Sequence, residues 1–211
     1  INLNVNAFDT RKWHGVELLA DADAGLEALS AALPQWRADP AWTQRAQRGA
    51  EGWRGDVARI TARRDGALPY DGDVIGAVQR SAADSARDDI VVCAAGTLPA
   101  ELHKLWRTAT PGGYHMEYGY SCMGYEIAGG LGVKMARPER DVIVMVGDGS
   151  YLMLNAEIAT SVMLGRKLII VVLDNRGYGC INRLQQACGG EPFNNLFVDC
   201  VQGPEGAPAI D

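Results

Sequence analysis

The segment Gly147-Asp148-Gly149-Ser150 follows an apolar run at 142–146, and the segment Asp174-Asn175-Arg176-Gly177 follows a second apolar run at 168–173. Short, uncharged apolar runs are typical of strands that are buried on both faces of a sheet. Residues 151–164 contain neither Pro nor Gly and are rich in Leu, Met and Ala, which predicts a helix. Strand, helix and strand in this order predict a right-handed crossover between two parallel strands.

Two oxygen-bearing side chains follow the two predicted strands. Because parallel strands end at the same edge of a sheet, we expect Asp148 and Asn175 to lie close together although they are far apart in the sequence. Gly165 is placed to end the helix between them. Carboxylate and amide oxygens, with carbonyls in glycine-rich turns, suit a hard cation such as Mg2+, which shares its remaining ligands with a phosphate. The sequence therefore predicts a divalent-cation site at this edge.

The composition is that of a globular protein and limits the class of partner. The 211 residues carry a formal net charge of -6 and have a pI near 5.1, which argues against a nucleic-acid surface because such a surface needs clustered basic side chains. No apolar run approaches the roughly 20 residues of a membrane span, and the opening does not resemble a signal peptide. The five cysteines have no zinc-type spacing and are odd in number. We therefore predict a cytoplasmic protein with reduced thiols.

The first part of the sequence predicts a strand and two helices. Residues 1–6 alternate between polar and apolar and are expected to form an edge strand without a partner in this chain. A helix is predicted at 15–33, with Asp21 or Asp23 near its start. A second helical stretch at 41–64 is interrupted by glycines. A strand without a partner at the start indicates a piece of a larger protein.

An α/β pattern follows. A helix at 74–87, capped by Asp73, precedes a strand predicted at 90–94. The turn after this strand contains Thr97 and is expected at the same sheet edge as Asp148. We predict an α/β fold with a doubly wound, mainly parallel sheet flanked by helices, preceded by linker helices.

The stretch 112–126 combines glycine, aromatic, sulfur-containing and imidazole side chains, a composition typical of a binding loop. Glycines in a helix predicted at 127–136 permit close approach of a neighbour or a ligand. Phosphates bind at helix N-termini because unpaired backbone amides point at them. We expect one such site after Gly149-Ser150, through the Ser150 hydroxyl and amide, and one after Met123-Gly124. The glycine motifs of Rossmann folds and of Walker-type nucleotide sites are absent.

Gly147-Asp148-Gly149, followed after 24 residues by Asp174-Asn175, resembles the cofactor motif of the thiamine-diphosphate-dependent decarboxylase and acetolactate-synthase superfamily. That motif usually ends in Asn-Asn, so Asp174 is a departure that leaves Asn175 intact. The resemblance implies that Asp148, the Asn175 side chain and the Gly177 carbonyl hold Mg2+ against the cofactor diphosphate, and that Met123 supports the bent cofactor. The predicted thiamine-diphosphate-binding residues are Thr97, Met123, Gly124, Gly147, Gly149, Ser150, Asn175 and Gly179.

Two longer strings, 113–126 and 174–185, are similar to one branch of this superfamily, which opens a cyclic 1,2-dione by hydrolysis in inositol catabolism. The resemblance implies that 1–10 is the last strand of a missing middle domain, that 11–66 forms linker helices, and that 67–211 is a diphosphate- and Mg-binding domain truncated at its C-terminus. It further implies an activating glutamate in the pyrimidine-binding domain of a second subunit, and hence a homodimer or homotetramer of the full-length protein. An acetolactate-synthase-like carboligase, or a cofactor-binding module inactive by itself, are the alternatives.

His115 is the predicted catalytic residue of this chain, acting in proton transfer or in hydrogen bonding to the substrate, because an imidazole titrates near neutral pH. A structural histidine is the alternative. Glu117 and Glu126 are further candidate acids or bases, with Glu126 alternatively bracing the following helix. Cys122 and Cys180 are not expected to act as nucleophiles, because the cofactor supplies the nucleophile.

Overall fold

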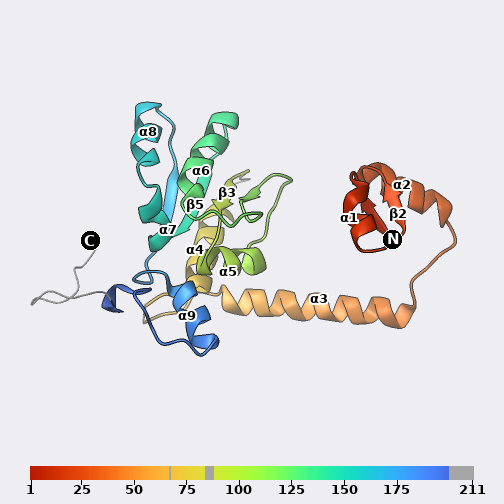
Figure 1. Ribbon diagram of the computed structural model, residues 1–211, viewed down its shortest axis with the longest axis horizontal. Coiled ribbons are helices and arrows are strands. Elements are labelled where there is room, and N and C mark those ends of the chain that lie inside the picture. Colours follow the sequence, from red (N-terminus) through yellow and green to blue (C-terminus); the bar gives the residue numbers. More distant parts are fainter. Residues whose placement is uncertain (67, 84–87, 200–211) are drawn as a thin grey trace, which may run out of the picture. The chain divides into compact units, whose positions relative to one another are not determined.

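The computed structural model describes residues 1–66, 68–83 and 88–199 (Figure 1). The chain divides into two compact units, Ile1–Arg54 and Gly55–Asp211. The boundary falls within the long helix α3 (Pro40–Ile60). Each unit is described by itself below. None of the helices in the described residues is both long enough and apolar enough to cross a membrane.

The first unit contains a small parallel sheet of β1 (Asn2–Asn4) and β2 (Glu17–Leu19), joined by α1 (Ala7–Lys12) and followed by α2 (Ala22–Ala32). The prediction that the opening strand has no partner in this chain is therefore wrong. The helix predicted from residue 15 begins only at α2, because the residues before it pair with β1. Asp21 caps α2 as predicted, accepting a hydrogen bond from the backbone amide of Asp23 at 2.9 Å.

Helix α3 is continuous, although glycines were expected to interrupt it. A Cβ at Gly49, Gly52 or Gly55 would meet nothing within 4 Å. These glycines therefore lie on the open surface of the helix and do not interrupt it. The next helix, α4 (Asp71–Ala83), begins before Asp73. Asp73 therefore lies inside the first turn instead of capping the helix, and the predicted extension to residue 87 falls outside the described residues.

The second unit is built on four parallel strands in the order β4-β3-β5-β6. The strands are β3 (Ile90–Cys93), β4 (Tyr114–Met116), β5 (Val142–Gly147) and β6 (Ile169–Leu173). The chain passes from β3 to one neighbour, β4, and then returns to β5 on the other side of β3 before it reaches β6. The change of direction creates a crevice between the carboxyl ends of β3 and β5, where open α/β sheets bind ligands.

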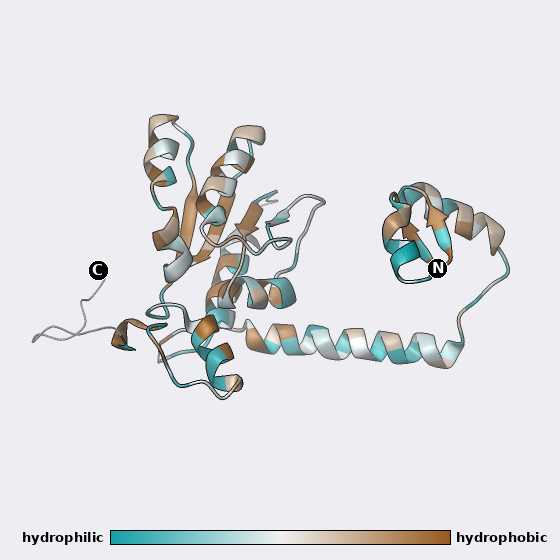
Figure 2. Cartoon of the chain, viewed as in Figure 1, coloured by the Kyte–Doolittle hydropathy of each residue, from teal (hydrophilic) through white to brown (hydrophobic). Residues whose placement is uncertain are grey.

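Helices cover both faces of this sheet. Alternate residues of β3 point in opposite directions: Val91 and Cys93 pack with α4 and α5 (Thr97–Leu105), whereas Ile90 and Val92 pack with α6 (Tyr125–Ala136) and α8 (Glu157–Met163). The strands form the apolar centre of the unit (Figure 2). The predicted doubly wound, mainly parallel α/β fold is confirmed.

The helix predicted at 151–164 is two helices. Helix α7 (Asp148–Met153) starts at the end of β5, and α8 begins after a break at 154–156. Leu154 leaves the helical conformation, with φ −149°, where Gly124 packs against it: a Cβ on Gly124 would lie 3.3 Å from the Leu154 Cβ. Gly165 follows α8 with a φ of +61°, the left-handed conformation that ends helices, as predicted. The remaining elements are α9 (Gly179–Ala187) and the 3-10 helix η1 (Phe197–Asp199).

Candidate functional site

A cavity of about 680 Å³ opens at the carboxyl ends of the strands. Its lining comes from the turn after β3, the start of α7, the end of β6 and the loop before α6. Most of the predicted site residues line it: Thr97, Met123, Gly147, Asp148, Gly149, Ser150, Asn175, Gly177 and Gly179. The crossover thus brings the two predicted strand ends together as the parallel topology requires.

Asp148 is the most deeply buried of the three carboxylate residues, Asp71, Asp148 and Asp174, that line this cavity. It is 8% exposed, and its Oδ2 accepts a hydrogen bond of 2.7 Å from the Gly177 amide, while Oδ1 accepts a longer one of 3.4 Å from the Asn175 amide. Burial raises the pKa of this carboxyl, the neighbouring amides oppose the shift, and the charge of Asp174 adds to it. The two amide contacts tie the end of β5 to the turn after β6.

The turn after β6 has a specific backbone shape. Arg176 and Gly177 both have positive φ, of 64° and 133°. Asn175 Oδ1 accepts a hydrogen bond of 3.3 Å from the Gly179 amide, and a Cβ at position 179 would lie 2.9 Å from that same oxygen. A side chain at 177 would meet the Asn195 carbonyl at 2.5 Å. Glycine at 179 therefore leaves the Asn175 amide where it is, and glycine at 177 permits both the positive φ and the close approach of the Asn195 carbonyl.

A second glycine contact shapes the start of α7. A Cβ on Gly149 would lie 2.7 Å from the Tyr178 ring and 3.4 Å from the Gly177 carbonyl oxygen. The Gly177 carbonyl therefore lies beside the same turn that carries Asp148. One carboxylate, one side-chain amide and one backbone carbonyl share this corner of the cavity, and these hard oxygen donors fit Mg2+.

Ser150 and Gly124 have internal partners behind the cavity. The Gly124 amide donates to Ser150 Oγ at 2.7 Å and to Glu126 Oε2 at 3.0 Å, and the Ser150 hydroxyl donates to Glu126 at 2.8 Å. Glu126 is fully buried, and burial raises the pKa of its carboxyl. In this structure the Ser150 hydroxyl donates its hydrogen to Glu126, and the predicted contact of the Ser150 hydroxyl and amide with a phosphate stays a prediction. Gly124 lies beside the cavity lining rather than in it.

Residues 94–204 match the family model described as the thiamine pyrophosphate enzyme, C-terminal TPP binding domain. The match covers more than half of the chain. This chain belongs to the thiamine pyrophosphate enzyme family. The family confirms the predicted cofactor, thiamine diphosphate, and the fold.

Curated relatives agree with this family. The chain is 40% identical, over 97% of its length, to the 3D-(3,5/4)-trihydroxycyclohexane-1,2-dione hydrolase of Geobacillus thermodenitrificans strain NG80-2, of which it covers 36%. It is 36% identical, over 93% of its length, to the protein of the same name from Bacillus thuringiensis strain Al Hakam, of which it covers 34%. The chain thus spans about a third of the length of these relatives.

A solved structure shows the same fold. The thiamine diphosphate-dependent 4-hydroxybenzoylformate decarboxylase of Rhodococcus jostii RHA1 superposes with a TM-score of 0.58 over 71% of this chain and 26% of its own, at 19% sequence identity. At this identity the likeness concerns the architecture alone.

In this thiamine pyrophosphate domain, His115 lies apart from the other predicted site residues. It belongs to β4, its Nε2 is 2.6 Å from the Tyr125 hydroxyl, and the two rings stack with centroids 5.9 Å apart. Both line a separate depression of about 440 Å³, with Arg137 and Arg140. His115 lines this depression and not the larger cavity, and its catalytic role stays a prediction.

Glu117 organises the loop that precedes α6. Its two carboxylate oxygens accept hydrogen bonds from the Tyr120 amide at 3.0 Å and the Cys122 amide at 2.6 Å. These amides lower the pKa of the carboxyl. The Glu117 carboxylate therefore stabilises the loop through these two amides. Glu126 stabilises the start of α6 through the Gly124 amide, which is the structural alternative predicted for that residue.

The predicted metal site depends on a single carboxylate. In the part of the chain that the structure describes, no group of three or more His, Cys, Asp or Glu side chains gathers as a metal cage. The corner formed by Asp148, Asn175 and Gly177 instead offers the small donor set with which Mg2+ bridges to a phosphate.

Sequence reasoning missed one wall of the cavity. Leu68, Pro69, Asp71 and Val74 line it, although they precede the family match. Arg183 was missed too: it donates a hydrogen bond of 2.8 Å to Thr97 Oγ1 from α9. The sequence pattern of α4 indicates that a helix starts near residue 71, but no motif identifies these residues as cavity lining.

Proposed function

We propose that this chain carries the diphosphate- and Mg2+-binding half of an enzyme that opens a cyclic 1,2-dione by thiamine-diphosphate-dependent hydrolysis. The proposed substrate is a trihydroxycyclohexane-1,2-dione and the proposed product is the open-chain aldehyde acid 5-deoxyglucuronate, in inositol catabolism. The single observation that supports this most is the similarity, along nearly the whole chain, to relatives named for this hydrolase activity.

Asp148, the Asn175 side chain and the Gly177 carbonyl are the proposed Mg2+ ligands. The hydrogen bonds from the Asn175 and Gly177 backbone amides orient the Asp148 carboxylate. The absence of a side chain at Gly179 leaves space for the Asn175 side-chain amide. When bound, thiamine diphosphate supplies a nucleophilic carbon and stores the electron pair released as the bond between the two carbonyls breaks.

Other residues of the cavity are proposed to position the cofactor and exclude water. Met123 lines the cavity beside the start of α6 and is the proposed support for the bent cofactor. Leu98, Ile181 and Leu184 add apolar lining, and an apolar surround strengthens the electrostatic contacts made inside it. Thr97 and Gly147 complete the proposed cofactor wall.

The proposed active unit includes partners outside this chain. A pyrimidine-binding domain of a second subunit would supply the activating glutamate, in a homodimer or homotetramer. The observation that favours this is the coverage, since the chain matches about a third of relatives that are much longer. A cytoplasmic location remains a prediction; Cys93, Cys122, Cys180 and Cys188 are free thiols.

Binding and turnover in the full-length protein test the proposal. We expect tight binding of thiamine diphosphate with Mg2+ and loss of that binding in EDTA, measured by calorimetry. We expect turnover of the trihydroxy dione and little of pyruvate. Preference for pyruvate would favour the second candidate, an acetolactate-synthase-like carboligase, and metal-dependent binding without turnover of either would favour a cofactor-binding module.

A further inference from the structure

One wall of the cavity comes from the connection between α3 and α4. Leu68, Pro69 and Asp71 line the cavity, and Asp71 is the first residue of α4. The described residues of this connection form neither a helix nor a strand. A wall without regular structure needs side-chain contacts to hold its position.

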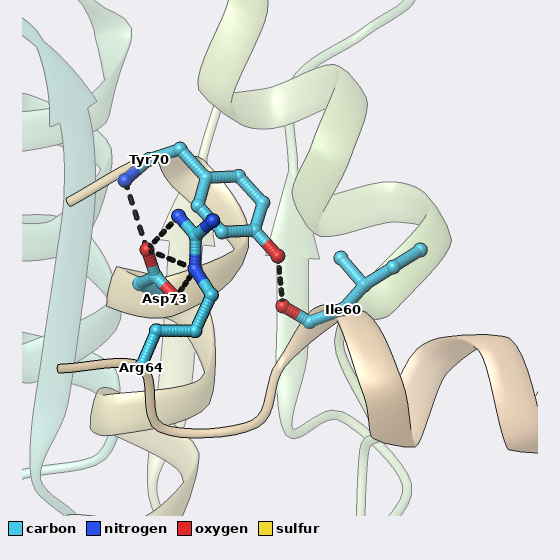
Figure 3. Close-up of polar contacts among 4 residues, drawn as sticks. All are labelled: Ile60, Arg64, Tyr70 and Asp73. Carbon is cyan, nitrogen blue, oxygen red and sulfur yellow. Dashed lines mark hydrogen bonds and ion pairs between the residues drawn. The ribbon is translucent and has the colours of Figure 1, made fainter.

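Three side chains provide those contacts and are called here the Arg64–Tyr70–Asp73 clamp (Figure 3). Arg64 donates from Nε and Nη2 to the Asp73 carboxylate, with shortest distances of 2.9 and 2.6 Å, and its guanidinium lies 4.0 Å from the centroid of the Tyr70 ring. The Tyr70 amide donates to Asp73 at 3.2 Å, and the Tyr70 hydroxyl donates to the Ile60 carbonyl at the end of α3. The connection is therefore tied at both ends.

The helices on either side of the clamp are in direct contact. A Cβ on Gly72 would lie 2.6 Å from the Tyr70 ring and 2.8 Å from the Ile60 carbonyl oxygen. A Cβ on Gly76 would lie 2.0 Å from the Thr61 carbonyl oxygen. Because the backbones touch here, the start of α4 has little freedom to move, and the first residue of the helix faces the cavity from a fixed position.

Asp71 is a half-buried carboxylate in this wall. Burial and the charge of Glu101 raise the pKa of its carboxyl, whereas the charge of Arg183 opposes the shift. Arg183 holds the hydroxyl of Thr97, which lines the same cavity. A half-buried carboxylate accepts strong hydrogen bonds from hydroxyl groups and repels anions.

We propose that Asp71 selects a neutral, polyhydroxylated substrate by accepting a hydrogen bond from one of its hydroxyl groups, and that the Arg64–Tyr70–Asp73 clamp positions Asp71 for this contact. The inference rests on the proposed function, because it assigns a specificity residue to the same cavity. A trihydroxy dione is neutral and offers hydroxyl donors, whereas pyruvate is an anion that the carboxylate repels. Asp71 thus favours one candidate substrate and disfavours the other.

Kinetics of Asp71→Asn in the full-length protein test the selection. We expect the KM for the trihydroxy dione to rise about tenfold, because a charge-assisted hydrogen bond is lost, while kcat and the affinity for thiamine diphosphate change less than about twofold. The KM for pyruvate should stay the same or fall. Asp56→Asn is the matched control: it makes the same substitution at an exposed carboxylate that pairs with Arg59 on α3 and does not line the cavity, and it should leave the KM for the dione unchanged.

A double-mutant cycle tests the clamp. Asp73→Asn should raise the same KM by a smaller factor, and the variant with both substitutions should be no worse than Asp71→Asn alone, because the clamp acts through Asp71. A merely structural role would instead lower thiamine diphosphate affinity and add to the Asp71→Asn effect.

Two outcomes would overturn the inference in an active enzyme: an unchanged KM for the dione in Asp71→Asn, or an equal loss of cofactor affinity. Failure of the wild-type protein to turn over the dione would instead contradict the proposed function. In that case calorimetric binding of the dione to the wild type and to Asp71→Asn decides the inference, since equal affinities contradict it and a selective loss supports it.

Discussion

Two buried carboxylates near the carboxyl ends of the strands differ in what they leave for a ligand. Glu126 is fully buried, and its carboxylate accepts hydrogen bonds from the Ser150 hydroxyl and the Gly124 amide inside the domain. Asp148 is 8% exposed and bonded to the Gly177 amide, but it also lines the cavity. Burial raises the pKa of both carboxyls. Access to the cavity, rather than burial or a shifted pKa, therefore separates the proposed metal ligand Asp148 from the structural Glu126.

Asp148→Ala should produce the largest effect. Removing the single carboxylate of the proposed metal corner should weaken Mg2+-dependent binding of thiamine diphosphate by at least about 100-fold. Calorimetry at fixed Mg2+ measures the change. Asp174→Asn is the control, because it restores the usual family pair beside Asn175 and should retain the affinity. If Asp148→Ala retains its affinity for the cofactor, Asp148 is not a metal ligand.

Glu126→Ala should act on stability instead. It leaves the Ser150 hydroxyl without its buried acceptor and removes one of the two acceptors of the Gly124 amide, which costs about 1–3 kcal/mol of unfolding free energy. Urea unfolding of the full-length protein, followed by a probe in this domain, measures the loss. Glu117→Ala offers a comparison, since that carboxylate braces an exposed loop and should cost less. Equal costs would contradict the distinction between the two glutamates.

Gly179→Ala should disturb the metal corner without removing a ligand. The new Cβ would lie 2.9 Å from Asn175 Oδ1 and displace the amide, so we expect about a tenfold loss in Mg2+-dependent cofactor affinity. Gly132→Ala is the matched control, because a Cβ at that helical position meets nothing within 4 Å. If both variants bind alike, the Asn175 amide is not a ligand.

The buried Glu126 should also make stability depend on pH. Its folded pKa is raised, so between the ordinary glutamate pKa of about 4.3 and the folded pKa the native state holds more protons than the unfolded state. The stability that this group contributes is thus complete below the unfolded pKa and is lost as pH rises through the folded pKa. Glu126→Gln should therefore flatten the fall in unfolding free energy that occurs as the pH rises above the ordinary glutamate pKa. An unchanged slope would contradict the raised pKa.

The sequence predicted the parts of the site that backbone topology decides. Apolar runs before Asp148 and Asn175 are enough to predict parallel strands that end together, and the structure confirms that both residues line one cavity. The position of Gly165 was also predicted correctly, because a glycine after a helix can adopt the positive φ that the structure shows there.

Packing between distant segments could not be predicted in the same way. The partner of β1, the break between α7 and α8, and the wall containing Asp71 each depend on contacts with residues elsewhere in the chain. The Ser150 hydroxyl was assigned to a phosphate because nothing in its local sequence indicates a buried Glu126 beside it. Local pattern thus predicts which residues reach the sheet edge, but not which of their atoms remain available.

His115→Asn should have the smallest effect and provides the sharpest test of this distinction. Its Nε2 pairs with the Tyr125 hydroxyl in a depression separate from the cavity, so we expect kcat and cofactor affinity to change less than about threefold, or about 0.7 kcal/mol. Tyr125→Phe removes the same hydrogen bond from the other side and should behave alike. A loss of kcat of about 100-fold in His115→Asn alone would instead make His115 a proton-transfer residue, because only the imidazole, and not its partner, would then be required.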